Sequence, residues 1–378
     1  MRHPFLMALM GFSAAIAISG AAQAAACPYT AGAETVTVPG RPFMAEASSD
    51  GCWLFVSMGA SSGVANGGVA VMRNEGGRFR VVQFVATKDY PGGLALSHDG
   101  KTLVAATEDS LAIYDVARLE AGDPGARTGT VPVGAGAIYV AISRNDRLLF
   151  VSQERRARIL VVDFVKVRTT GENAELGAVE MGRAPVGLAF SVDGARLYAT
   201  SESVPRAFPM SCNGEGDSHG QHPEGALTII DVALAGRNPA ASILGIRKAG
   251  CNPVRVAVSP DDRTVWVTAR GDFRLEGFAA KQLEGASTAA PDISVKVGPA
   301  PIGVAVRPDG TQIWVAASNR FGHGKPGALT AVSPTGEVLR TVATGVFPRD
   351  IGFLPDGKTL VVAQFDSRAV QFVPTDAP

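Results

Sequence analysis

The sequence predicts an all-β protein, a seven-bladed β-propeller with four-stranded blades. One short phrase occurs seven times: an apolar run, a turn with Asp or Asn, and a second β-rich run. The turns recur every 46 to 49 residues, apart from one interval of 68, at Asp50, Asp99, Asn145, Asp193, Asp261, Asp309 and Asp356. A period in the forties with several strands per unit is typical of propeller blades. The 44 glycines, 24 prolines and 19% charged residues also favour a turn-rich β-protein.

Each repeat is expected to supply four strands, named a to d from the central channel outward. In the second repeat these strands are predicted at 91–97, 102–107, 110–116 and 127–133. The Asp-Gly pair between strands a and b favours a hairpin, because glycine adopts positive φ without steric cost. The aspartate that ends strand c recurs at one blade position, in Asp115, Asp163 and Asp231. That recurrence indicates turn capping rather than catalysis.

The ring is expected to close through the N-terminal segment. The last repeat stops after strand c at 368–373, and a lone β-rich segment at 34–38 precedes the first repeat. This segment fits as the outer strand of blade seven, which leaves no long open sheet edge. Residues 25–378 are therefore predicted to form one domain.

Residues 1–24 are typical of a secretory signal peptide: a charged start, an apolar stretch and an A-x-A site. We expect a periplasmic or secreted protein. A lipoprotein anchored at Cys27 is the alternative, although the leucine usual three positions before the cysteine is absent. No later segment offers the about 18 apolar residues that a membrane-spanning helix needs.

The four cysteines allow three pairings, and the propeller topology selects one of them. Cys27 and Cys52 fall on the lower face in adjacent blades, and Cys212 and Cys251 fall on the upper face. We expect Cys27–Cys52 to lock the ring closure and Cys212–Cys251 to fasten a loop. Free thiols for catalysis or metal binding are the alternative.

Charge excludes some partners. Lys and Arg total 35, as do Asp and Glu, and no basic block or basic strip with interleaved aromatics occurs. This argues against nucleic acid and anionic membrane as main partners. We expect a monomer that binds a protein partner or a small anionic ligand.

The repeats resemble the YVTN-repeat, lactonase-like seven-bladed propellers over essentially the whole mature chain. The resemblance rests on the pattern P-x-G-[VL]-A-[VF]-x-x-D-G-x-x-[LI]-[YW]-V-A at 185–199 and 301–316, with variants elsewhere. It implies the fold, whereas relatives include lactone hydrolases, propeller subunits of periplasmic quinoprotein dehydrogenases and surface proteins. Function must therefore be sought where the repeats differ.

The repeats differ in strand a, where small residues are expected because seven strands crowd around the axis. Four large polar residues stand there, Glu46, Tyr139, Arg255 and Asp350, and Arg349 adds a cation at the upper entrance. One interpretation is an internal salt-bridge plug. The other is a mouth in which Tyr139, Arg255 and Arg349 bind an anion and Glu46 or Asp350 transfers protons.

Two upper-face connections are longer than the rest, 203–225 in blade four and 318–327 in blade six. They carry Asp217, His219, His222 and His323. These residues are candidates for a divalent metal site, His219 and His222 also for acid–base catalysis, and His323 for ligand binding. A polar loop with solvated histidines is the alternative.

The leading hypothesis is an exported binding module that acts through its upper face. A role as an accessory to a periplasmic redox or catabolic enzyme fits the resemblance. The intact scaffold without a recognisable catalytic set favours a binding module. The alternative is a lactone hydrolase, or a related lyase or isomerase, with its site at the channel mouth.

Overall fold

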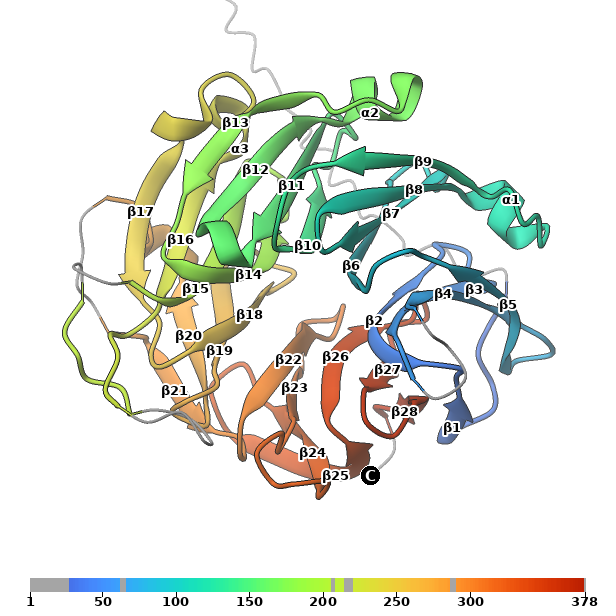
Figure 1. Ribbon diagram of the computed structural model, residues 1–378. Helices are drawn as coiled ribbons and strands as arrows, with labels where there is room; N and C mark the ends of the chain where they lie inside the picture. Colours follow the sequence, from blue (N-terminus) through green and yellow to red (C-terminus); the bar gives the residue numbers. More distant parts are fainter. Residues whose placement is uncertain (1–26, 62–65, 205–207, 214–219, 286–289, 377–378) are drawn as a thin grey trace, which may run out of the picture.

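Seven four-stranded antiparallel sheets form a ring around a central channel (Figure 1). The structure is a computed structural model that describes residues 27–61, 66–204, 208–213, 220–285 and 290–376. Strand order follows the chain in six sheets, so these blades are simple meanders, and the seventh sheet combines the last three strands of the chain with the first one, as predicted. Within the described residues, no helix is both long and apolar enough to cross a membrane.

The strands occupy equivalent positions in all blades. The innermost strands, a, are β2 (Arg41–Ala47), β6 (Pro91–Leu96), β10 (Ala137–Ile142), β14 (Arg183–Phe190), β18 (Pro253–Val258), β22 (Pro301–Val306) and β26 (Pro348–Phe353). Strands b are β3 (Trp53–Gly59), β7 (Thr102–Thr107), β11 (Leu148–Gln153), β15 (Arg196–Ser203), β19 (Thr264–Ala269), β23 (Ile313–Ala317) and β27 (Thr359–Gln364). Strands c are β4 (Gly68–Asn74), β8 (Ser110–Asp115), β12 (Arg158–Asp163), β16 (Ala226–Asp231), β20 (Arg274–Ala279), β24 (Pro326–Val332) and β28 (Ala369–Pro374). Strands d are β5 (Phe79–Ala86), β9 (Arg127–Pro132), β13 (Glu175–Glu180), β17 (Ile243–Lys248), β21 (Ile293–Lys296), β25 (Val338–Val346) and β1 (Glu34–Thr37).

Ring closure follows the predicted scheme. The N-terminal β1 pairs antiparallel with the C-terminal β28, as the outer strand of blade seven (Figure 1). The Cys27–Cys52 disulfide ties the segment before β1 to blade one. Both predicted disulfides are present and none of the four cysteines is free. A lipidated Cys27 would have no thiol for this bond, so the lipoprotein alternative is incompatible with it.

The core is divided among the junctions between blades. Seven clusters of buried apolar side chains each draw on two adjacent blades, for example Phe150 of blade three with Leu197 of blade four. Strand b contributes most heavily, because it is covered on both faces and reads as a continuous apolar run, as in β7, where every residue is buried. Each blade therefore depends on its neighbours for burial.

Strand c is followed in three blades by a short helix that the sequence did not predict: α1 (Val116–Glu120), α2 (Phe164–Thr170) and α3 (Val232–Ala235). Single-turn 3₁₀ helices occur elsewhere, as η1 (Glu154–Arg156), η2 (Pro239–Ala241) and η3 (Ala280–Gln282). The side chains of Asp115, Asp163 and Asp231 accept a hydrogen bond from the third residue of each α-helix. The predicted capping role is confirmed: each aspartate caps the N-terminus of the helix that follows it.

Connections define the two faces of the ring. The a–b and c–d connections lie on the lower face, and the b–c and d–a connections lie on the upper face. Strand a therefore begins at the upper end of the channel and runs toward its lower end.

Candidate functional site

Every blade carries a β-bulge at the upper end of strand a. In all seven blades the register between strands a and b shifts just after the first residue of the repeat, a proline in six of them. A bulge leaves residues out of the ladder and changes where their side chains point. The bulge residues are the ones in which the seven repeats differ most.

Hydroxyl groups of strand b hold the bulges in place. Thr268 Oγ1 accepts from the Arg255 N–H at 3.0 Å and donates to the Ile302 carbonyl of the next blade at 2.8 Å. Thr200 links Gly187 to the Val254 carbonyl in the same way. The bulge is thus fixed both within a blade and to the neighbouring blade.

We call the residue that lies two positions after the first residue of each repeat the second bulge position, and the residue before it the first bulge position. From blade one to blade seven, the second bulge position alternates between a large residue and glycine. It is held by Met44, Gly93, Tyr139, Gly187, Arg255, Gly303 and Asp350. A Cβ added to Gly93 would lie 2.8 Å from Cδ1 of Tyr139, and one added to Gly187 would lie 3.0 Å from Cα of Arg255. Gly93 and Gly187 therefore leave room for the large residue of the next blade, whereas a Cβ added to Gly303 would meet Ile351. Sequence reasoning singled out the large residues and missed this alternation.

Arg255, Asp350 and Tyr139 meet in the channel from three different blades. Arg255 Nε lies 3.6 Å from Asp350 Oδ1, and the guanidinium carbon lies 3.8 Å from the centre of the Tyr139 ring. All three residues are buried, with 6–8% of their surface exposed. The ion pair supports the plug interpretation for this level of the channel. Arg255 Nε and Tyr139 Oη nevertheless have no hydrogen-bond partner among the described residues.

Arg349 lies at the first bulge position, next to Asp350. The other blades have Phe43, Gly92, Ile138, Val186, Val254 and Ile302 at this position, so Arg349 is the only charged member of an otherwise apolar collar. Its guanidinium carbon lies 4.0 Å from the centre of the Phe43 ring and within 5.5 Å of the Phe347 and Phe365 rings.

No carboxylate of the described residues forms an ion pair with Arg349, and its Nε has no hydrogen-bond partner there. Burial lowers the pKa of the guanidinium. A cation in this condition gains from an anionic partner, since charge-assisted hydrogen bonds are roughly twice as strong as neutral ones.

Two carboxyl groups in the channel have raised pKa values. Burial raises the pKa of Asp350 to about 6, although Arg255 opposes the shift. Burial, followed by the charge of Asp350, raises the pKa of Glu46 to about 7. Glu46 also lines a cavity of about 280 Å³ with Gly352 and Pro308, toward the lower end of the channel. The sequence predicted that both carboxylates lie beside the channel, but it did not show that Glu46 lies nearer the lower end.

The upper rim also carries carboxylates that sequence reasoning missed. The residue two positions after the strand-b hydroxyl position is Glu108, Glu154 and Glu202 in blades two to four, and Arg270 in blade five. Arg270 donates to both carboxylate oxygens of Glu202, at 2.9 and 3.1 Å. Burial and then Glu202 raise the pKa of Glu154, whereas Arg349 opposes the shift. An alignment of the repeats at strand b would have revealed these charged residues in consecutive blades.

The predicted histidine cluster is resolved only in part. His222 pairs with Cys212 in an isolated bridge, and its Nδ1 lies 2.9 Å from the Pro223 carbonyl. His323 is exposed on the blade-six connection. His219 and Asp217 lie outside the described residues. In the part of the chain that the structure describes, no three His, Cys, Asp or Glu side chains are grouped to hold a metal ion.

Comparison with known proteins supports the fold. No family model matches the chain, and no curated protein matches it, so membership of the YVTN-repeat family stays a prediction. Hydrazine synthase from Kuenenia stuttgartiensis is similar in structure, with a TM-score of 0.66 at 18% identity over 91% of this chain and 97% of that one. A chain of the mitotic checkpoint complex gives 0.66 at 15% identity, over 99% and 98%. A protein of unknown function from Desulfotomaculum acetoxidans gives 0.62 at 14% identity, over 87% and 91%.

Proposed function

We propose that this protein is an exported binding module whose upper channel mouth takes a small ligand through a carboxylate or a similar anionic group. The observation that carries the proposal is Arg349, a guanidinium set among aromatic rings with no internal ion-pair partner in the described chain. The rings fix the side chain from its faces, so its N–H groups are left for a ligand. Tyr139 Oη, deeper in the channel, adds a buried polar atom that has no hydrogen-bond partner in the described structure.

Export to the periplasm is part of this proposal. The N-terminal residues have the pattern of a secretory signal, and the two disulfides are typical of an oxidising compartment. Exposed apolar side chains stand on the upper-face connections of three consecutive blades, namely Met210, Phe273 and Phe321, with 56%, 39% and 37% exposed. Such residues suit contact with a partner protein, in keeping with an accessory role to a periplasmic enzyme.

A thermal-shift screen of small carboxylates, phosphates and sulfonates tests the ligand proposal. A ligand that raises the melting temperature of the native protein should have no effect on Arg349→Gln. The matched control is Arg41→Gln, because Arg41 also stacks on Phe365 but is exposed and lies 3.7 Å from Asp366. Glu154→Gln should strengthen binding, since it removes a negative charge that acts on Arg349. Equal shifts in Arg349→Gln and the native protein would contradict the proposal.

A second candidate function is lactone hydrolysis, or a related lyase or isomerase reaction, at the same mouth. It is favoured by Asp350, a carboxyl group with a pKa of about 6 beside the Arg255 cation. Such a group is able to accept and return a proton near neutral pH, while an arginine stabilises an oxyanion. Sugar and aromatic lactones, assayed with and without chelator, test it: turnover that Asp350→Asn abolishes would support hydrolysis. Absence of turnover across the panel would favour binding alone.

A further inference from the structure

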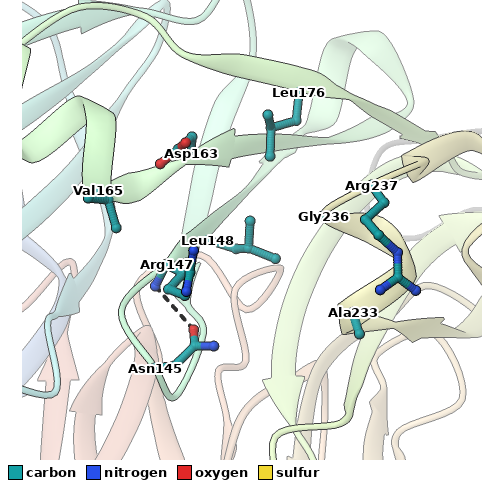
Figure 2. Close-up of a pocket in the computed structure, with 9 residues that line it drawn as sticks. All are labelled: Asn145, Arg147, Leu148, Asp163, Val165, Leu176, Ala233, Gly236 and Arg237. Carbon is teal, nitrogen blue, oxygen red and sulfur yellow. Dashed lines mark hydrogen bonds between the residues drawn. The ribbon is translucent and has the colours of Figure 1, made fainter.

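A surface groove lies away from the channel, on the lower face between blades three and four (Figure 2). Its volume is about 520 Å³. Blade three contributes its a–b turn and the region of α2, and blade four contributes the end of α3. The lining residues are Asn145, Arg147, Leu148, Asp163, Val165, Leu176, Ala233, Gly236 and Arg237.

The turn at this groove differs from the other six. The first turn position holds aspartate in every blade except blade three, where it is Asn145. Asn145 Oδ1 accepts from Ser143 Oγ at 2.8 Å and from the Arg147 N–H at 3.1 Å. Asp261 makes the same two bonds in blade five, at 2.6 and 3.1 Å. The amide therefore keeps the structural role of the aspartate and removes its negative charge.

This change removes the carboxylate that would stand beside Arg147. In blade five, Asp261 lies 3.7 Å from Arg263, the residue equivalent to Arg147. No described carboxylate comes within ion-pair distance of Arg147 or of Arg237, across the groove. The one carboxylate in the lining, Asp163, accepts through Oδ1 from the Lys166 N–H. Two unpaired cations thus flank one groove.

Apolar surface lies between and beside these cations. Leu148 lies between Arg147 and the Ala233–Arg237 segment (Figure 2), and its Cδ1 would be 3.0 Å from a Cβ added to Gly236. Val165 and Leu176 are 47% and 42% exposed. A groove of about 390 Å³ at the corresponding place between blades five and six has a different charge, because its lining includes Asp261 and Asp309 but no arginine or lysine.

We propose that the groove between blades three and four binds a peptide segment of a partner protein in which acidic and apolar side chains alternate. Unpaired arginines match the acidic side chains, and the exposed Val165 and Leu176, together with the partly buried Leu148, match the apolar ones. A segment of this kind pairs both arginines and covers the exposed apolar surface at once. The site is on the opposite face from Arg349 and does not depend on the function proposed for the channel mouth.

The test measures fluorescence polarisation of labelled hexapeptides with the purified protein. One peptide alternates glutamate with leucine, and its control alternates lysine with leucine. We expect the glutamate peptide to bind at least tenfold more tightly, with reduced hydrogen exchange at residues 143–147 and 233–237. Absence of binding, or equal binding of the two peptides, would overturn the proposal.

Three variants locate the site. Arg147→Ala and Asn145→Asp should each weaken binding of the glutamate peptide at least fivefold. Asn145→Asp installs the residue that the other six turns carry, so it should fold normally. Arg263→Ala is the matched control at the equivalent position of blade five and should stay within twofold of the native affinity. An equal loss in Arg263→Ala, or no loss in the first two variants, would place the peptide elsewhere and reject this groove.

Discussion

Arg255 reaches the face of the Tyr139 ring from two blades away, with its guanidinium carbon 3.8 Å from the ring centre. The contact crosses blade four, whose residue at this position is Gly187. A Cβ there would lie only 2.4 Å from the Val254 carbonyl oxygen and 3.0 Å from Arg255 Cα. The middle of the channel is therefore closed by side chains from alternate blades, whereas Arg349 remains unpaired above them within the described structure.

Replacing Arg255 tests the closed level of the channel. Arg255→Met should lower the free energy of unfolding by about 3–5 kcal/mol at pH 8, because it leaves the carboxylate of Asp350 buried without its partner. The loss should shrink below pH 6, where Asp350 becomes protonated. Urea unfolding at pH 8 and pH 5 measures both values. A loss of the same size at both pH values would show that the ion pair is not its cause.

The pH dependence of stability should report Glu46. Its pKa of about 7 in the fold lies above its ordinary value of 4.5, so folding favours the protonated form. This stabilisation is complete below about pH 4.5 and is lost as the pH rises through 7. Glu46→Gln should match the native protein near pH 4 and exceed it by about 3 kcal/mol at pH 8, at about 1.4 kcal/mol per pKa unit. Parallel stability curves for the two proteins would contradict this assignment.

The disulfide at the ring closure should contribute strongly to stability. Cys27→Ser combined with Cys52→Ser should lower the free energy of unfolding by about 2–4 kcal/mol, because the bond restricts the unfolded chain. Hydrogen exchange should rise first in β1 and β28, the strands that close the ring. If hydrogen exchange rises first in a distant blade instead, the disulfide does not stabilise the pairing of β1 with β28.

Much of the fold could be predicted because its determinants are local and repeated. The a–b turn of each repeat, which is Asp-Gly in five of the seven, and the aspartate that ends strand c in three blades act within a few residues, so period and spacing revealed them. The disulfide pairs followed from topology, and both are present in the structure. The short helices α1 to α3 were missed because only a few residues form them.

The site was less predictable because its determinants lie between blades. The sequence indicated Tyr139, Arg255 and Asp350 as large residues at a crowded position. It did not show that Arg255 pairs with Asp350 while Arg349, one residue earlier, pairs with no carboxylate in the described chain. That difference arises from the bulge, which gives consecutive residues different surroundings.

The central claim is that Arg349 serves a ligand, whereas Arg255 serves the fold. The most direct measurement combines urea unfolding with calorimetric titration of the best ligand from the thermal-shift screen, on Arg349→Gln and the native protein. We predict that Arg349→Gln costs about 1–2 kcal/mol of stability, from its contacts with aromatic rings, and weakens ligand binding at least tenfold. A loss of stability as large as that of Arg255→Met, with ligand affinity unchanged, would contradict the claim and make Arg349 part of the internal plug.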